Sequence, residues 1–321
     1  MALDTRAEAP TSARLRARLM PSTITSWTRL LAWANLVLQG VIVGTGGAVR
    51  LTGSGLGCPT WPRCTPESFV ATPEMGIHGV IEFSNRLLTF VLVAVAVLLF
   101  LAVVRTAPTG RRLVVPALLI GLGIPAQGIV GGITVLTRLN PYVVGLHFVV
   151  SIGLVALATV LVWRVYFPVA DRADVVPAST RAAGWGVAAL TLVTIAVGII
   201  TTGSGPHAGD SGAARNGLDS EFLQHVHSWP AYALFALTLV MLVLTRTAPR
   251  VRRYVVLLLA TEVLQIAVGI TQARTGLPAG LVAVHMLLAC VATGLATAVV
   301  LAARQPVRDG HLSPAGTATS A

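Results

Sequence analysis

Eight long apolar runs constrain this chain more than any other feature of its sequence. Each run has about the 20 residues that an α-helix needs to cross a bilayer. Only 11% of the residues are charged, against roughly 25% in an average soluble domain. The sequence therefore excludes an ordinary soluble protein and predicts an all-α integral membrane protein with eight transmembrane helices. The runs lie at about 27–49, 76–104, 113–136, 141–163, 182–202, 222–245, 254–273 and 279–303.

Positive charge is distributed unevenly between the two ends of these helices. All 23 basic residues are arginines, and the formal net charge is +11. Arg86 lies within the second run, and most of the others flank one end of the helices. Because basic residues are retained on the cytoplasmic side, this pattern predicts a multi-pass cell (plasma) membrane protein with both termini in the cytoplasm. It also explains the charge without a nucleic-acid partner. The arginines assigned to the opposite, external end are Arg50, Arg63, Arg138, Arg215 and Arg274.

The segments outside the apolar runs are expected to be cytoplasmic. Residues 1–26 lack the apolar core of a secretory signal and are predicted to form a basic tail, an Arg-rich organellar transit segment being the alternative. Residues 167–181 are predicted to be a linker, and residues 304–321, which are rich in Pro, Gly, Ser and Thr, a solvated tail.

The second half of the chain repeats the first. Because each half holds an even number of spans, both halves enter the membrane in the same direction and should be related by an axis along the membrane normal. We expect two pseudo-equivalent four-helix bundles produced by tandem duplication, at 27–166 and 182–303. Gln127, Val130, Gly131, Thr137, Leu139 and His147 recur 138 residues later as Gln265, Val268, Gly269, Thr275, Leu277 and His285.

Histidines recur at matching depth in the two halves. His147 and His285 are equivalent and lie about two turns below the external ends of the fourth and eighth helices, with His227 at the corresponding depth in the sixth. Two histidines on facing helices of a bundle can hold a haem iron, so His227 and His285 are predicted to face each other as haem ligands. A hydrogen bond to a neighbouring helix is the alternative for each, and zinc is a weaker one because the thiols lie elsewhere.

The second helix carries a different polar set. Asn85 stands where the repeat would place the counterpart of His227, and Glu82 and His78 lie one and two turns earlier on the same face. Glu82 is a candidate base, with pairing to Arg86 or His78 for helix packing as the alternative. Glu262 in the seventh helix has no predicted role beyond a hydrogen bond to a neighbouring helix.

The cysteines fall into two kinds. Cys58 and Cys64 bracket five residues of the first external loop, where an oxidising environment favours a disulfide over a metal or redox dithiol. Cys290 lies among small apolar residues of the eighth helix and is expected to pack in the core.

Five segments in register with the duplication resemble the haem A synthase family over about residues 27–303. The resemblance implies eight helices in two bundles and an oxidoreductase that converts a ring methyl of haem O to the formyl group of haem A, with a haem b cofactor in the C-terminal half. The segments are G-S-G-L-G-C-P-T-W-P-R-C from Gly53, E-F-S-N-R-L-L from Glu82, L-H-F around His147, H-S-W-P-A-Y from His227 and V-H-M-L-L-A around His285.

The same resemblance implies roles for individual residues. His227 and His285 match the axial ligands of haem b, and His147 matches one ligand of the substrate haem. Glu82 matches the first residue of the family's E-x-x-H-R pattern, its essential carboxylate, and Arg86 matches the arginine of that pattern.

Asn85 departs from the family pattern, which has histidine at this place. Two interpretations stay open: His147 alone holds the substrate iron, or His78 supplies a second ligand from higher in the helix. His225 fits the motif less well than His227 and is expected to be a loop or supporting residue.

The leading hypothesis is thus a haem A synthase that uses water-derived oxygen to make the cytochrome oxidase cofactor. A b-type cytochrome for membrane electron transfer and a haem transporter or chaperone are the alternatives. Besides haem O, haem A and the lipid membrane, the hypothesis brings in a haem O synthase and an electron acceptor as partners. Whether the chain forms a homo-oligomer is left open.

Overall fold

The computed structural model describes residues 15–306 except 17, 107–109, 168–171 and 175. Most of the two predicted tails therefore lies outside the described residues. Within them, eight helices are long and apolar enough to cross a membrane, which confirms the predicted all-α, multi-span fold. They are α2 (Ser26–Leu51), α3 (Gly76–Val104), α4 (Gly110–Leu136), α5 (Pro141–Tyr166), α6 (Ala178–Ser204), α7 (Ser220–Leu244), α8 (Pro249–Arg274) and α9 (Ala279–Ala302), with a short 3₁₀ turn, η1 (Pro73–Met75), before α3.

Local sequence signals determine where several of these helices begin. Thr25 caps α2 by accepting a hydrogen bond from the backbone N–H of Thr28, and the Thr28 side chain in turn accepts one from the backbone N–H of Thr25. Asn140 caps α5 directly before Pro141, whose missing N–H costs nothing in the first turn. Asp219 caps α7 in the same way through Phe222.

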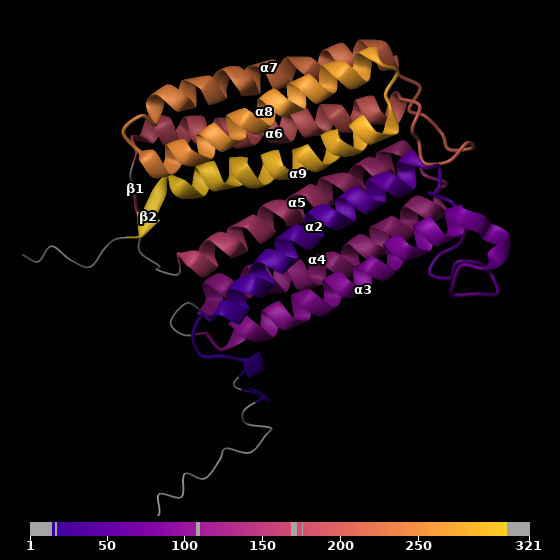
Figure 1. The fold of residues 1–321 in the computed structure, drawn as a ribbon, viewed down its shortest axis with the longest axis horizontal. Coiled ribbons are helices and arrows are strands. Elements are labelled where there is room, and N and C mark those ends of the chain that lie inside the picture. Colours follow the sequence, from indigo (N-terminus) through magenta and orange to yellow (C-terminus); the bar gives the residue numbers. More distant parts are fainter. Residues whose placement is uncertain (1–14, 17, 107–109, 168–171, 175, 307–321) are drawn as a thin grey trace, which may run out of the picture.

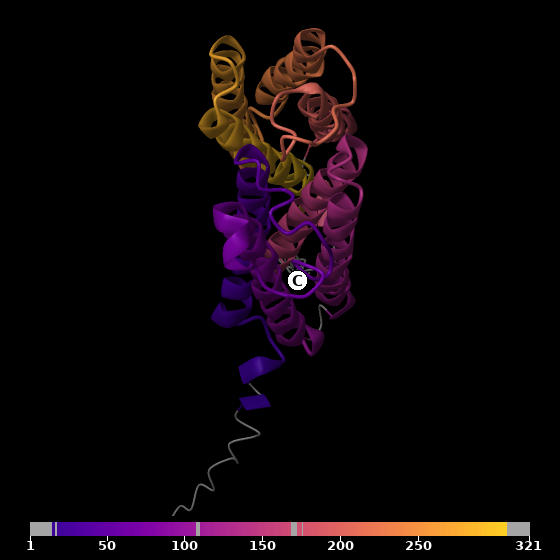
Figure 2. The same cartoon turned by 90° about the vertical axis from the view of Figure 1, so that its right-hand side faces the viewer.

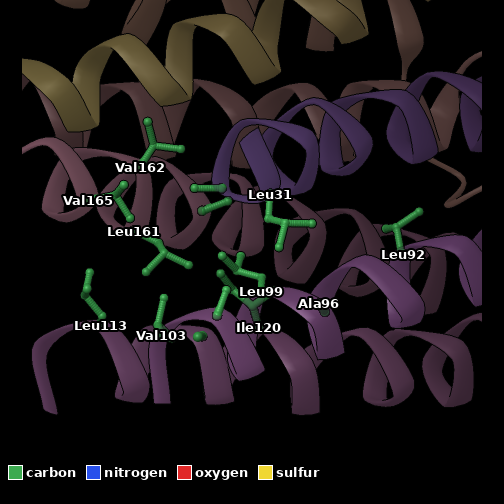
Figure 3. Packing of buried hydrophobic residues seen from close by; sticks show 14 of the residues in the cluster. Leu31, Leu92, Ala96, Leu99, Val103, Leu113, Ile120, Leu161, Val162 and Val165 are labelled. Carbon is green, nitrogen blue, oxygen red and sulfur yellow. The ribbon is translucent and has the colours of Figure 1, made fainter. Parts of the chain in front are cut away.

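The helices form two bundles in chain order (Figures 1 and 2). Helices α2–α5 make the N-terminal bundle and α6–α9 the C-terminal bundle. Leu31, Leu99, Ile120 and Leu161, one from each helix, meet in the N-terminal core (Figure 3). Lipid tails are as apolar as these side chains, so the cohesion of this core comes from close packing rather than from exclusion of water.

The interface between the bundles is itself symmetric. Helix α5 packs against its counterpart α9, while α9 also packs against α2 and α5 against α6. Exchanging the two halves leaves this set of contacts unchanged, as expected for a duplicated chain with an approximate two-fold axis.

The repeat extends to backbone conformation in the turns that follow α4 and α8. Leu139 and Leu277 both adopt the left-handed conformation, with φ of 60° and 59°. The N–H of Leu139 donates to the carbonyl of Thr134 at 2.7 Å, and that of Leu277 donates to the equivalent Gln272 at 2.8 Å. Two leucines accept a conformation that L-residues normally avoid, so the duplicated sequence reproduces its fold even at an unfavourable position.

Two long loops meet at one end of the molecule, here called the loop end. They are residues 52–72 of the N-terminal bundle and residues 205–219 of the C-terminal bundle. The N–H of Gly55 donates to the carbonyl of Gly209 at 2.8 Å. Arg50, at the end of α2, reaches across to donate to the carbonyls of Thr202 and His207. The two bundles are therefore joined by polar contacts at this end.

The opposite end, here called the terminal end, holds a feature that the sequence did not predict. Arg172–Asp174 (β1) pairs antiparallel with Arg304–Pro306 (β2). These residues belong to the linker and to the start of the tail, which were expected to lack regular structure. Backbone pairing between segments so far apart depends on the whole fold, and neither segment carries a local pattern that announces it.

Candidate functional site

Three histidines lie within the loop-end portion of the bundles, and each ring packs against a glycine of the preceding helix. A Cβ atom added at Gly131 would lie 3.3 Å from Cε1 of His147, and one at Gly269 would lie 3.3 Å from Cε1 of His285. A Cβ at Gly198 would lie only 2.8 Å from Cε1 of His227. The glycines therefore provide the space in which the rings lie.

The structure brings His227 and His285 together, as predicted. Their ring centroids are 6.2 Å apart, and the ring planes are inclined by 71°. Nδ1 of His285 is buried with no hydrogen-bond partner among the described residues.

This spacing suits a metal ion between the two rings. About 2 Å for each metal–nitrogen bond and about 1 Å from each nitrogen to its ring centre give roughly 6 Å between centroids. Without a ligand, Nδ1 of His285 would be a buried polar atom without the hydrogen-bond partner that such atoms require. The donor set of His227 and His285 thus fits a haem iron.

The N-terminal bundle has a different arrangement at the equivalent place. His147 has a buried Nδ1 with no partner among the described residues. Its backbone carbonyl accepts hydrogen bonds from Nε2 of Gln127 at 2.8 Å and from Oγ of Ser151 at 2.9 Å. Asn85 of α3 is hydrogen-bonded to α2, because its Oδ1 accepts a hydrogen bond of 2.7 Å from Oγ1 of Thr45. This half therefore presents one histidine where the other presents two.

Glu82 lies beneath the loop of residues 52–72 and is only 5% exposed. Its Oε2 accepts a hydrogen bond from the backbone N–H of Cys58 at 2.7 Å, and its Oε1 accepts one from Nη2 of Arg86 at 2.6 Å. Arg86 also donates to the carbonyls of Cys58, Thr60 and Arg63. The carboxylate and the guanidinium together fasten this loop to α3.

The disulfide between Cys58 and Cys64 is present in the structure, as the sequence predicted. It closes the part of the loop that Glu82 and Arg86 hold. The ion pair within α3, which the sequence offered as the alternative role of Glu82, and the predicted disulfide are thus neighbours, and both stabilise this loop.

His78 lies apart from His147. It is exposed, and its Nδ1 is 2.9 Å from Oγ of Ser54. With Met75 and Asp210 it lines an open cavity of about 620 Å³ between the loops of the two halves. Among the described residues no hydrogen bond joins His78 to His147, and the choice between the two interpretations of the N-terminal ligand set stays a prediction.

Three further residues have a defined place in the structure. His225 lies in α7 rather than in a loop, and it is exposed. Cys290 is buried in a small core cluster with Val43, Ile152 and Val155, so its packing role is confirmed. Glu262 forms the expected hydrogen bond to a neighbouring helix through Thr238 of α7.

Sequence reasoning missed the glycines that seat the histidine rings and the threonine that binds Asn85. A signal for the glycines was available, since Gly131 and Gly269 recur with the histidines that they contact, each 16 residues later. No comparable signal marks Thr45, because its contact with Asn85 depends on how α2 and α3 are rotated against each other.

Chemically, the two halves offer unequal sites. The C-terminal bundle has a closed pair of imidazoles, which can hold a metal without leaving a position for substrate. The N-terminal bundle has the imidazole of His147 and, on α3, a buried carboxylate paired with a partly exposed guanidinium. One half can thus position a group for electron transfer, and the other a group for reaction.

Several characterised proteins are similar to parts of this chain. The heme A synthase of Bacillus pumilus (strain SAFR-032) is 31% identical over 151 residues, which are 46% of this chain and 47% of that protein. The heme A synthase of Halalkalibacterium halodurans is 33% identical over 122 residues, 38% of this chain and 40% of that protein. A protoheme IX farnesyltransferase of Thermus thermophilus is 36% identical over 89 residues, 27% of this chain and 14% of that protein. In these matches the chain spans less than half the length of each relative.

A broader match comes from the family model COX15-CtaA, described as cytochrome oxidase assembly protein, which fits residues 29–299. That range begins in α2, ends in α9 and includes the three histidines, Glu82 and the disulfide. The chain therefore belongs to the cytochrome oxidase assembly protein family COX15-CtaA.

Proposed function

We propose that this protein is a haem A synthase, which oxidises a ring methyl of haem O to the formyl group of haem A. One observation carries the proposal: the two halves of a duplicated fold hold unequal sites. His227 faces His285 in one half, whereas His147 has Asn85 and a buried Glu82–Arg86 pair in the other. The family and the two similar heme A synthases support it.

The reaction balances with water as the oxygen source. The methyl group and one water give a hydroxymethyl group, two electrons and two protons. A second water gives a geminal diol with two more electrons and two more protons, and loss of one water from the diol leaves the formyl group. The protein must therefore position the methyl, remove protons and provide an outlet for four electrons.

In this proposal the N-terminal bundle binds haem O as its substrate. His147 provides the imidazole, held by the hydrogen bonds of Gln127 and Ser151 to its carbonyl. Asn85 is tied to Thr45, and His78 is directed to Ser54 at the surface. These contacts favour His147 as the single protein ligand, with Asn85 lining the other side of the site.

Glu82 is the proposed proton acceptor. Its two carboxylate oxygens already accept hydrogen bonds from Cys58 and Arg86, which fix its direction. If Arg86 releases its hydrogen bond to Glu82, Oε1 becomes free to take a proton, while the backbone N–H of Cys58 keeps the carboxylate in place. Arg86 is the positioning residue in this scheme, because its other bonds go to the disulfide loop.

The C-terminal bundle is proposed to hold haem b through His227 and His285. The two imidazoles would hold the iron of this group, which would supply the one-electron redox chemistry of this half. The residues of this half keep the two rings fixed against Gly198 and Gly269, and no open ligand position is left there for substrate.

Orientation and partners complete the proposal. The arginine distribution places both termini and the terminal end in the cytoplasm, and the loop end outside. A protohaem farnesyltransferase, the kind of enzyme that one partial relative is named for, would supply the farnesylated substrate as a haem O synthase. A membrane electron acceptor would reoxidise the protein.

The test is to express the full chain in a host that makes haem O but no haem A, and to identify the extracted haems by chromatography and mass. We expect hydroxymethyl and formyl haem from the wild type and neither from Glu82→Gln. Glu74→Gln removes an exposed carboxylate of η1 and should leave product formation unchanged. Product from Glu82→Gln would exclude the proposed role of that residue.

A b-type cytochrome is the second candidate, since the facing pair of His227 and His285 would serve a pure electron carrier equally well. Unchanged haem O beside a low-spin haem b, in protein shown to be folded in the membrane, would favour it. His285→Ala should remove the low-spin spectrum in either case.

A further inference from the structure

The C-terminal bundle contains a buried carboxyl group that the proposed reaction does not use. Glu262 of α8 is only 5% exposed, and Thr238 of α7, its neighbour, is fully buried. Oγ1 of Thr238 donates to Oε1 of Glu262 at 2.8 Å, whereas Oε2 is buried with no partner among the described residues. An ionisable group at membrane depth is costly, so such residues are candidates for function.

This carboxyl group lies on the side of α8 that leads to the histidine pair. Glu262, Gln265 and Gly269 are spaced three and four residues apart, which places them on one face of the helix. The ring of His285 packs against Gly269, about 10 Å along the helix from Glu262. Gln265 lies between them, and its Oε1 is also buried without a partner among the described residues.

The duplication shows that the fold does not need this pair. At the repeat offset of 138 residues, Glu262 corresponds to Ile124, and Thr238 corresponds to Ala96 when aligned through His227 and Asn85. Both counterparts are buried apolar residues, and Ala96 lies in the N-terminal core (Figure 3). The same position in the same architecture is thus filled by hydrocarbon in one half and by a hydrogen-bonded carboxyl group in the other.

The surroundings of Glu262 contain no opposing charge among the described residues. Helix α7 contributes Thr238, and the buried face of α9 contributes Ala292 and Ala296. The other titratable groups of these helices are Glu221, His225, His227 and Tyr232 on α7, Arg250, Arg252, Arg253, Tyr254 and Arg274 on α8, and His285 and Cys290 on α9. Tyr232 is exposed, and Cys290 packs in the cluster with Val43, Ile152 and Val155.

We propose that Glu262 is a protonation site coupled to the oxidation state of the C-terminal haem, taking up one proton at Oε2 for an electron that arrives there and releasing it when that electron leaves. The inference rests on the proposed assignment of that haem to His227 and His285. A ferric haem with two neutral imidazoles carries positive charge that a ferrous haem lacks, and charges interact strongly at low dielectric. Protonation of the nearby carboxylate compensates for the charge of the added electron, so that one proton is taken up for each electron.

The experiment is a redox titration of the C-terminal haem in the purified full chain over a series of pH values. We expect the wild-type midpoint potential to rise as the pH falls, and this pH dependence to be lost in Glu262→Gln. Glu221→Gln, which removes an exposed carboxylate of α7, is the matched control and should retain the wild-type profile. An unchanged profile in Glu262→Gln, or a flat profile in the wild type, would overturn the inference.

A second variant guards against misfolding. The double change Glu262→Ile with Thr238→Ala copies the residues of the N-terminal half into a site of the same architecture, so the low-spin spectrum should persist while the pH dependence disappears. Redox-difference infrared spectra provide an independent readout: a carboxyl C=O band should change with oxidation state in the wild type and be absent from both variants. A band that persists in the variants would assign the proton to another group.

These outcomes separate the two proposals. If the wild type binds no low-spin haem, the assignment of His227 and His285 fails, and this inference fails with it. If the haem is present and Glu262 leaves its potential unchanged, only the coupling fails and the haem A synthase proposal stands.

Discussion

Three glycines determine how closely the histidine rings approach the neighbouring helices. An added Cβ would lie 2.8 Å from the ring of His227 at Gly198, a distance that real Cβ atoms do not show, and would make tight contacts of 3.3 Å with the other two rings at Gly131 and Gly269. The histidines and their matching depth could be predicted from the duplicated sequence, since polar residues stand out in apolar helices. Their packing against Gly131, Gly198 and Gly269 could not, because side-chain direction depends on helix rotation. Asn85 shows the same limit: the sequence reveals the missing histidine, and the structure supplies its hydrogen bond to Thr45.

Gly198→Ala should displace the ring of His227. The added methyl carbon would lie 2.8 Å from Cε1, a distance that forces the ring or the helix to move. We expect destabilisation of about 1–3 kcal/mol, as for overpacked cores, and a reduced low-spin haem signal measured by absorbance per mole of protein. Gly184→Ala, in the same helix, is the control, because its added carbon would make only ordinary contacts at 3.8 Å. Equal haem content in both variants would contradict this role of Gly198.

At the scale of the helices, the sequence was a good guide to where each span lies, and a poor one to what the connecting segments do. The eight predicted runs match α2–α9 to within a few residues, because continuous apolar stretches leave little choice in a membrane. The anchoring of the disulfide loop was not predictable, since the N–H of Cys58 reaches Glu82 only through the path of that loop. The pairing of β1 with β2 was missed for the same reason: both are short segments whose partners are distant in sequence.

Arg86→Gln should loosen the loop on α3. The substitution removes charged hydrogen bonds to Glu82 and to the carbonyls of Cys58, Thr60 and Arg63, each worth about 1.5–3 kcal/mol. We expect a broad-specificity protease to cut this variant between residues 59 and 72 at least about tenfold faster than the wild type. The cleavage sites are identified by mass spectrometry of the fragments.

The matched control for this experiment is Arg63→Gln. Arg63 donates to Pro66 and stacks on Phe69 within the loop, so its loss leaves the contact between the loop and α3 intact. Equal cleavage rates in the two variants would show that Arg86 does not fasten the loop.

For the whole molecule, the two halves are joined at two levels. Arg50 and Gly55 connect the loops at the loop end, and the symmetric contacts of α5 and α9 fill the middle (Figure 1). The relation between the two histidine sites is therefore fixed by the fold, as a reaction that moves electrons from one half to the other requires.

Arg50→Gln should weaken the connection between the halves at the loop end. Arg50 donates to the carbonyls of Thr202 and His207, and the loss of a hydrogen bond from a charged donor costs about 1.5–3 kcal/mol. We expect a lower thermal unfolding midpoint in detergent. Arg215→Gln is the control, because Arg215 donates to Ala213 and Pro206 within its own loop and should shift the midpoint less. A larger shift in the control would contradict the role of Arg50.

The central position of α9 has a consequence for how the protein is assembled in the cell. This helix contacts α2 and α5 of the first half and α6 and α8 of its own half, and it carries His285. It is also the last of the eight to leave the ribosome. Until it inserts, α2 and α5 lack a neighbour and His227 has no opposite ring, so a prematurely terminated chain would be left without its paired histidine site. Chain order alone thus delays completion of that site until every other helix has entered the membrane.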